Sequence, residues 1–347
     1  MKILINTPDL SLPGGVANHY KGLLPYWSEE VKYNFVGGRK GIPGFLMLPY
    51  DYLKFCLLCC FGGYNVVLLN PSLGRTAIKR DAMFLKLAKW FGKKTVVFFH
   101  GWDKMIASQI DKSPRSFVKH FNRANGLLVL ANSFKKQLQQ WGITKPIYLT
   151  TTKVDDVLLS NFKIEDKIFN NTLLFLARVE ANKGIFITIE VMKILSSQYP
   201  DLKLFIAGTG SALQKAKDQK EQLQLNNVHF LGNVSGDELV KTFTKSDIYI
   251  LPTTHGEGMP TSVLEAMAFG LPVISRPVGG LNDFFKEQKM GDLIEGIEPQ
   301  EYANRISLLL ENKERIVKMS KYNYKYAQEH FMASKVASEI ESILKNI

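Results

Sequence analysis

Two α/β domains, each built on a doubly wound parallel sheet, are the fold that this sequence predicts. Short apolar runs rich in β-branched residues alternate with longer amphipathic segments along the whole chain. Continuous apolar strands separated by helices are typical of parallel sheets covered on both faces. The 347 residues are enough for two hydrophobic cores at roughly 150 residues each. We therefore expect two Rossmann-like domains that face each other across a cleft.

The apolar runs place the strands in order. In the first half the predicted strands span 2–6, 65–70, 94–100 and 126–132, and in the second half 172–178, 203–208, 228–232, 248–252 and 272–276. Between the halves, the Thr-, Asp- and Asn-rich stretch at 150–171 has no clear period. We place the domain boundary there, with domains at 1–155 and 165–325. Residues 324–347 predict one or two terminal helices.

The positive charge is concentrated in the first half. The net charge is +12, and residues 1–154 contain 22 Lys+Arg and 7 Asp+Glu against 22 and 25 in the remainder. Such an excess indicates an anionic partner. Residues 74–94 mix large apolar side chains, among them Ile78, Met83, Phe84, Leu87, Trp90 and Phe91, with seven cations. This pattern fits either a helix lying on anionic lipid or an ordinary helix with a solvated face. Nucleic acid is not expected, because no recognised binding module is present.

The three cysteines lie together in one apolar segment. Cys56, Cys59 and Cys60 have no second Cys or His cluster at metal-ligand spacing, so we expect reduced thiols in a cytoplasmic protein without a signal peptide. The uncharged run at 55–69 is shorter than the roughly 20 residues of a spanning helix, and Gly62 and Gly63 interrupt it. It predicts the end of a helix followed by a buried strand.

Several predicted strands end in residues that a purely structural role does not require. Gly14 and Gly15 precede a helix, where backbone amides could approach an anion or simply form a turn. His100 follows a strand of the first half, where histidines are also common as structural residues. Arg178 and Lys183 follow the first strand of the second half, and two cations there suit a diphosphate or a solvated surface. The turns at Gly208 and at Val234 are generic by themselves.

Residues 255–275 contain two glutamates eight positions apart. Pro260 favours a helix start, so the amides of Thr261, Ser262 and Val263 are expected to be donors at a positive helix end. Glu265 lies one turn later and leans back toward that end. Glu257 and Glu265 would be about 12 Å apart along a helix at 1.5 Å per residue, more than the roughly 5–9.5 Å of paired catalytic carboxylates. Acceptance of hydrogen bonds from sugar hydroxyls is the favoured use.

Taken together, these motifs resemble the retaining GT-B glycosyltransferases of family 4. The chain has that family's E-x7-E pattern at Glu257 and Glu265, followed by EAMAFG and LPVIS, and its R-x4-KG pattern from Arg178 to Gly184. The early Gly-Gly loop, the histidine at a strand end, AGTG, FLGNV and VGG occur in the family's order and cover nearly the whole chain.

The resemblance implies a role for each matching position. Arg178 and Lys183 would hold the diphosphate of a nucleotide sugar, aided by Gly15 and the amides after Pro260. Glu265 would bind the ribose, Glu257 the donor sugar, and His100 the sugar near the acceptor. The remaining donor-binding positions would be Gly14, Gly208, Val234, Gly258, Met259, Thr261 and Ser262. The C-terminal helix, 325–347, would join the first domain.

The expected activity is transfer of a hexose or N-acetylhexosamine from a UDP- or GDP-linked donor to a glycan or lipid-linked acceptor, with retention and without a metal or other cofactor. A place in polysaccharide or glycolipid synthesis, at the inner face of the membrane, follows from the basic first half. The chain departs from the family at Asn282 and Asp283, which replace Pro-Glu, and at 150–156, which replaces an NGVD-like turn. A nonhydrolysing sugar-nucleotide epimerase and a catalytically silent GT-B subunit are the alternatives.

Overall fold

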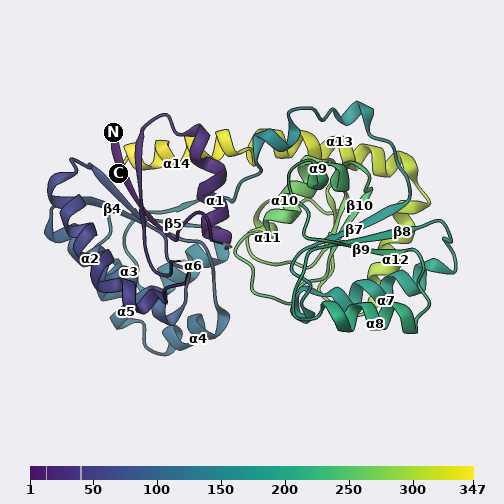
Figure 1. Ribbon diagram of the computed structural model, residues 1–347, viewed down its shortest axis with the longest axis horizontal. Helices are drawn as coiled ribbons and strands as arrows, with labels where there is room; N and C mark the ends of the chain where they lie inside the picture. The colour runs from purple at the N-terminus through teal and green to yellow at the C-terminus, as the bar shows by residue number, and fades with distance from the viewer. Residues whose placement is uncertain (13, 40) are drawn as a thin grey trace. The chain divides into compact units, whose positions relative to one another are not determined.

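A computed structural model describes residues 1–12, 14–39 and 41–347 and contains two parallel six-stranded sheets (Figure 1). The chain divides into two compact units, which are described separately below. Unit 1 contains Met1–Lys153, Gly256–Met259 and Ala333–Ile347, and unit 2 contains Val154–His255 and Pro260–Met332. The predicted fold class is confirmed in its sheets and alternating helices.

The sheet of unit 1 has the order β2-β1-β3-β4-β5-β6, and all its strands run parallel. Its strands are β1 (Lys2–Thr7), β2 (Glu30–Phe35), β3 (Val66–Leu69), β4 (Lys94–Phe99), β5 (Gly126–Val129) and β6 (Ile147–Leu149). The four central strands are apolar and buried along almost their whole length, as expected for a sheet covered on both faces.

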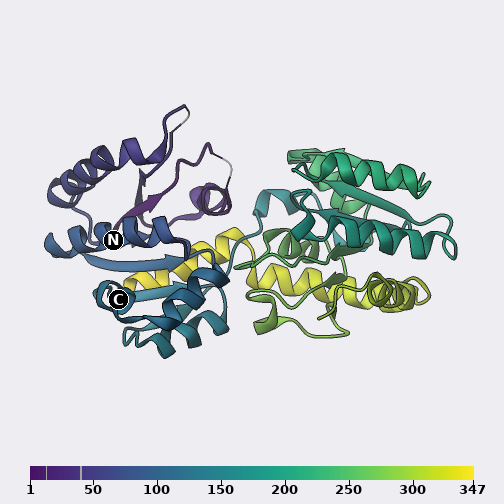
Figure 2. The same ribbon diagram turned by 90° about the horizontal axis from the view of Figure 1, so that it is seen from below.

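Helices cover both faces of this sheet. They are α1 (Gly15–Leu23), η1 (Leu24–Tyr26), α2 (Gly44–Phe61), α3 (Arg75–Trp90), α4 (Lys104–Lys112), α5 (Arg115–Phe121), α6 (Asn132–Trp141) and α14 (Ala333–Lys345). Helix α14 contacts α1, whereas α3 lies between α2 and α5 and contacts both. Figure 2 shows both termini in this unit, and both Met1 and Lys345 form ion pairs with Glu29.

The sheet of unit 2 has the order β12-β11-β10-β7-β8-β9 and is likewise parallel. Its strands are β7 (Thr172–Leu176), β8 (Lys203–Ala207), β9 (Val228–Gly232), β10 (Ile248–Leu251), β11 (Val273–Ser275) and β12 (Gly291–Leu293). The strands that follow β7 extend the sheet in one direction, and those that follow β10 extend it in the other. The order of the sheet therefore reverses between β7 and β10.

The helices of unit 2 include one that runs past the expected end of the domain. They are η2 (Asp156–Leu159), η3 (Ile164–Asp166), η4 (Ala181–Lys183), α7 (Ile185–Ser196), α8 (Leu213–Gln222), α9 (Gly236–Thr244), α10 (Thr261–Ala268), α11 (Leu281–Phe284), α12 (Pro299–Leu310) and α13 (Lys313–His330). Helix α13 remains in unit 2 as far as His330, so the chain enters unit 1 at Ala333, compared with the expected position 325.

Candidate functional site

In unit 2, the polar residues of the second half gather where the sheet order reverses. Strands β7 and β10 are neighbours, and in open parallel sheets a ligand binds beyond the carboxyl ends of the strands at such a reversal. Arg178 and Lys183 follow β7, and the segment from Thr253 onward follows β10. The sheet topology thus brings two stretches that are 70 residues apart in sequence to one edge.

Lys183 is buried at this edge and Arg178 is exposed. Lys183 ends the short helix η4 with 8% of its surface accessible. Arg178 has a 61% exposed side chain and forms an ion pair with Glu180 at 2.7 Å. An exposed pair of this kind contributes little to stability, so the guanidinium can exchange its carboxylate for another anion at small cost.

Gly184 holds η4 against the end of β10. Its φ of +84° is a conformation that side chains rarely adopt, and a Cβ there would overlap the carbonyl of Pro252. The backbone amides of Thr254 and His255 both donate to the carbonyl of Asn182, at 2.8 and 3.1 Å. These contacts fix the position of Lys183 relative to the loop that leads to α10.

Helix α10 begins at the same edge. Pro260 is its N-cap residue and provides no side-chain cap, and first-turn amides of a helix lack partners within it. From the sequence, the amide of Val263 was expected to be a donor available at this helix end. That expectation is wrong, because the Val263 amide donates to the carbonyl of Pro260 at 3.0 Å. Ser262 shares a 2.7 Å hydrogen bond with Tyr249 of β10, which orients the first turn.

Glu265 lies one turn into α10 and is 9% exposed. Its carboxylate is therefore largely removed from water near a helix N-terminus, where the helix dipole favours negative charge.

The loops after β8 and β9 complete this edge of unit 2. Gly208, with a φ of +134°, approaches the carbonyl of Ala177 too closely for any side chain, and its amide donates to the carbonyl of Gly232 at 2.6 Å. Val234 is half-buried just beyond β9. Gly208 thus lets the β7 and β8 loops pack together next to Arg178.

In unit 1, His100 belongs to a polar network at the carboxyl ends of the strands. Its Nε2 lies 3.0 Å from the side-chain oxygen of Asn70, which also accepts from the hydroxyl of Tyr20. The Asn70 amide in turn donates to the carbonyl of Asn6 at 2.8 Å. Burial, followed by the nearby His19, holds the pKa of His100 well below its usual value. The ring is therefore neutral near pH 7, with Nε2–H donating to Asn70 and Nδ1 left as an acceptor.

His19 of α1 packs against His100, with the ring centroids 5.1 Å apart. Burial, and then the charge of Lys153, lower the pKa of His19 to about 3. Neither ring nitrogen has a hydrogen-bond partner among the described residues. Sequence reasoning missed His19, Asn70 and Lys153.

Gly14 and Gly15 lie at the start of α1. Nothing lies within 4 Å of a Cβ built at either residue among the described atoms, and α1 has no side-chain cap. The residue before them, Pro13, is outside the described residues. The described residues therefore leave space beside Gly14 and Gly15 at the start of α1.

The loop that carries Glu257 belongs to unit 1. A Cβ on Gly258 would overlap the carbonyl of His100, and one on Gly256 would lie 3.3 Å from the carbonyl of Trp102. Glu257 is half-buried and Met259 is buried. The two glutamates of the E-x7-E pattern therefore lie in different units, Glu257 beside the His100 segment and Glu265 in α10.

A family model matches most of unit 2. Residues 161–326 match the family described as glycosyl transferases group 1. This segment contains Arg178, Lys183, Val234, Glu257 and Glu265, and it covers nearly all of unit 2.

Curated relatives support the same assignment over part of their length. An uncharacterized glycosyltransferase of Haemophilus influenzae is 29% identical over 180 residues, which are 51% of this chain and 50% of the relative. Spore coat protein SA of Bacillus subtilis is 27% identical over 49% of the chain and 48% of its own length. The chain thus spans about half the length of these two curated relatives.

Solved structures match over the full chain. The structure of Anabaena HepE in complex with UDP and glucose has a TM-score of 0.75 at 18% identity and covers 100% of both chains. Sucrose-phosphate synthase from Thermosynechococcus elongatus has a TM-score of 0.74 at 16% identity, with 99% and 98% covered. The chain therefore has the GT-B fold.

Proposed function

We propose that this protein is a retaining glycosyltransferase that moves a hexose or N-acetylhexosamine from a nucleotide sugar to a hydroxyl of a glycan or lipid-linked acceptor. The observation that carries the proposal is the edge of unit 2, where Lys183, Arg178 and the amino end of α10 meet within the segment that matches the glycosyltransferase family. Two cations and a helix N-terminus are a suitable site for a diphosphate.

The donor is held by its charges and hydroxyls. Lys183 and Arg178 neutralise the diphosphate, and the first-turn amides of α10 donate to it. Glu265 accepts hydrogen bonds from the ribose hydroxyls, and Val234 contacts the base. Because these groups are positioned before the reaction, they stabilise the charge that develops on the leaving diphosphate without reorganising.

Transfer proceeds by departure of the nucleoside diphosphate and attack from the same face of the sugar. The bond from the anomeric carbon to the phosphate oxygen breaks, the acceptor oxygen forms the new bond, and the acceptor's proton passes to the leaving phosphate oxygen. Glu257 accepts from hydroxyls of the donor sugar, and the neutral His100 ring contacts that sugar near the acceptor. No metal or other cofactor takes part in this scheme.

The relatives favour particular substrates. Anabaena HepE has been solved with UDP-glucose, which favours UDP over GDP as the donor nucleotide. A relative from Escherichia coli, named for colanic acid biosynthesis, is 24% identical over 62% of this chain and favours cell-surface polysaccharide assembly. With 22 Lys+Arg and 7 Asp+Glu in residues 1–154, we place the protein at the cytoplasmic face of an anionic membrane, with residues 74–94 at the surface.

The test of this function is a thermal-shift panel of UDP, GDP and ADP sugars. We expect a UDP or GDP sugar to raise the melting temperature of the wild type and to raise that of Glu265→Ala much less. If no nucleotide sugar stabilises the wild type, the function is wrong and a silent subunit is the better account. Interconversion of two nucleotide sugars without an acceptor would instead establish an epimerase.

The stereochemistry and the metal requirement have their own tests. NMR of the product is expected to show the anomeric configuration of the donor, and inversion would refute retention. Activity is expected to survive EDTA, whereas its loss and recovery on addition of a divalent cation would contradict the metal-free scheme.

A further inference from the structure

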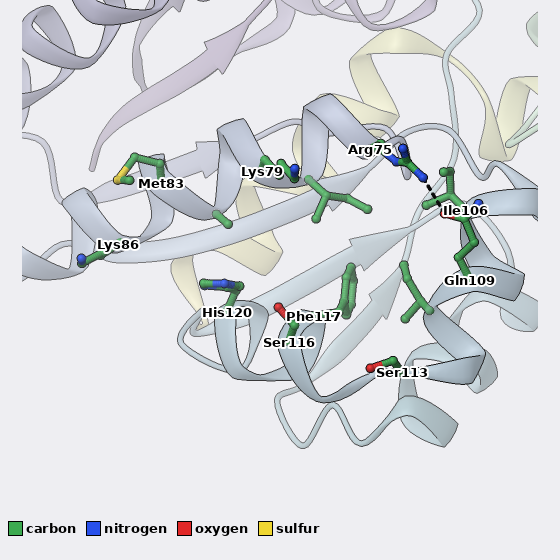
Figure 3. Close-up of a pocket in the computed structure, with 13 residues that line it drawn as sticks. Arg75, Lys79, Met83, Lys86, Ile106, Gln109, Ser113, Ser116, Phe117 and His120 are labelled. Atoms are coloured by element: carbon green, nitrogen blue, oxygen red, sulfur yellow. Dashed lines mark hydrogen bonds between the residues drawn. The ribbon is translucent and has the colours of Figure 1, made fainter.

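Helices α3, α4 and α5 of unit 1 enclose a groove to which the proposed function assigns no ligand. Its volume is about 500 Å³, and Figure 3 shows the side chains that line it. The base of the groove is apolar. Phe117 and Ala82 belong to the buried core of unit 1, and Ile78, Ile106 and Ile110 pack against that core while facing the groove. Hydrocarbon placed there would be removed from water.

The rim of the groove is cationic. Arg75, Lys79 and Lys86 line it, and their spacing of four and seven residues places them on one face of α3. All three are exposed, and none has a carboxylate partner among the described residues. Like charges four apart on a helix repel, so an anion bound between Arg75 and Lys79 relieves an unfavourable interaction.

Nearby carboxylates are engaged elsewhere and do not line the groove. Asp81 is buried in an ion pair with Arg80, Asp103 caps α4 through the amides of Met105 and Ile106, and Asp111 accepts from the indole of Trp141. The groove therefore combines an apolar base with a rim of one sign, which is complementary to an amphiphile with an anionic head.

The neighbouring helix α2 indicates that this amphiphile is a lipid. Six large apolar side chains of α2 are between 52% and 80% exposed: Phe45, Leu46, Tyr50, Leu53, Leu57 and Phe61. Their spacing forms one stripe along the helix. A contiguous exposed apolar stripe of six large side chains is uncommon on a soluble protein and indicates a contact surface.

Helix α2 is 18 residues long and has a mean hydropathy of 1.4, so by length and composition it could cross a membrane. Only 17% of its residues are buried. Its other face, however, is fixed to unit 1. Phe55 packs against Phe84 of α3, with centroids 4.9 Å apart, and Asp51 is fully buried in an ion pair with Arg39. A helix held in this way can lie in the plane of a bilayer surface, with its exposed stripe among the lipid chains.

We propose that the groove between α3 and α4–α5 binds one phosphate-bearing lipid, with its chain on the apolar base and its phosphate between Arg75 and Lys79. Arg75 follows the loop in which Asn70 bonds His100 and the amide of Leu73 donates to the carbonyl of Gly101. The phosphate end therefore adjoins the His100 segment. This lipid would be the carrier of the acceptor, and that role, though not the binding itself, rests on the proposed function.

The test is titration of the full-length protein with farnesyl phosphate below its micelle concentration, followed by calorimetry. We expect farnesyl phosphate to bind at least tenfold more tightly than farnesol, and inorganic phosphate not to bind at the same concentrations. Equal binding of farnesol would show an apolar site without a phosphate contact, and equal binding of inorganic phosphate would show a simple anion site. Either result, or no binding, would overturn the proposal.

Matched variants locate the site. Lys79→Glu is expected to weaken farnesyl phosphate binding at least tenfold, whereas Lys104→Glu, an exposed lysine of α4 that does not line the groove, is expected to change it less than twofold. Leu53→Ser is expected to reduce sedimentation with phosphatidylglycerol vesicles and to leave farnesyl phosphate binding unchanged. Equal effects of the two lysine variants would overturn the assignment to this groove.

The same variants distinguish a failure of the groove proposal from a failure of the proposed glycosyltransferase function. Lys79→Glu is expected to keep the thermal shift given by a nucleotide sugar, which also shows that it is folded. A protein that binds nucleotide sugar but not farnesyl phosphate would contradict only the groove. One that binds farnesyl phosphate but no nucleotide sugar would contradict only the glycosyltransferase function.

Discussion

Gly258 is closely packed in the loop that carries Glu257, so a substitution there is expected to affect both stability and activity. A Cβ built on Gly258 would overlap the carbonyl oxygen of His100 and lie 3.0 Å from a methyl carbon of Leu130, so a methyl group there would push the Glu257 loop away. We predict that Gly258→Ala lowers the free energy of unfolding by about 1–3 kcal/mol and reduces transfer activity. Gly38→Ala is the control, because its nearest neighbours are at 3.9 Å. Equal urea-unfolding midpoints of wild type and Gly258→Ala would contradict this contact.

His19 is expected to make the protein sensitive to mild acid. Its pKa of about 3 in the folded protein lies below the ordinary value of 6.5. At pH values between these two, the unfolded chain binds more protons than the folded protein, so stability falls as the pH falls. From pH 6.5 to pH 5 the loss is about 1–2 kcal/mol for this one group. His19→Gln is expected to reduce that slope in chemical denaturation, whereas His229→Gln, at an exposed position, is not. Equal slopes for wild type and His19→Gln would refute the shifted pKa.

The sequence was informative about site residues only where a motif stood beside them. Asn6, Asn70 and His100 each end an apolar run, a signal that could have found all three. Of the three, only His100 was predicted as a site residue. Asn6 and Asn70 were missed because their link to His100 depends on which strands are neighbours in the sheet, and the sequence pattern does not show this. Asn182 and Tyr249 were missed for the same reason, since Thr254 and His255, which donate to Asn182, and Leu176, which accepts from Tyr249, all lie more than 70 residues away in sequence.

At the scale of elements, the missed strands share a physical cause. The strands β2, β6 and β12 were not predicted, and all three are edges of their sheets. Edge strands are short or half-solvated, so they lack the continuous apolar run that identified the central strands. Helix α2 was only partly seen, because Pro49, Asp51 and Lys54 interrupt its apolar sequence. The buried pairing of Asp51 with Arg39 is a long-range feature that periodicity does not show.

Helix α2 provides a direct comparison between its two faces. Leu53 is 62% exposed and Phe55 is fully buried, so Leu53→Ala is expected to change the free energy of unfolding by less than about 0.5 kcal/mol. Phe55→Ala is expected to cost about 3–5 kcal/mol. Denaturant unfolding of both variants measures the difference. A cost for Leu53→Ala near that of Phe55→Ala would show that the exposed stripe is part of the core.

At the scale of the whole molecule, the C-terminal helix completes the first unit. Glu341 of α14 is buried and accepts from the backbone amides of Ser28 and Glu29, at 2.8 and 2.9 Å. Removing the carboxylate leaves two amides without their partner, so Glu341→Ala is expected to cost about 1–3 kcal/mol. The exposed Glu329→Ala is expected to change stability by a few tenths of a kcal/mol. Similar melting temperatures for the two variants would contradict a structural role for α14 in unit 1.

The two-sheet fold was predictable because the central strands of both sheets are uninterrupted apolar runs. Which unit holds each loop was not predictable, as Gly256–Met259 belongs to unit 1 although it lies between segments of unit 2. That assignment depends on the contacts of Gly256 and Gly258 with distant carbonyls, which no local pattern encodes.

The central claim, that the edge of unit 2 binds a nucleoside diphosphate, is tested most directly by calorimetric titration of UDP. We predict that wild type binds UDP and that Lys183→Ala raises the Kd at least tenfold, because a charge-assisted hydrogen bond is worth about 1.5–3 kcal/mol. The control is Lys193→Ala, an exposed lysine on α7, which is expected to keep the wild-type Kd, with circular dichroism confirming that both variants are folded. Failure of the wild type to bind UDP or GDP, or equal affinities of wild type and Lys183→Ala, would contradict the account.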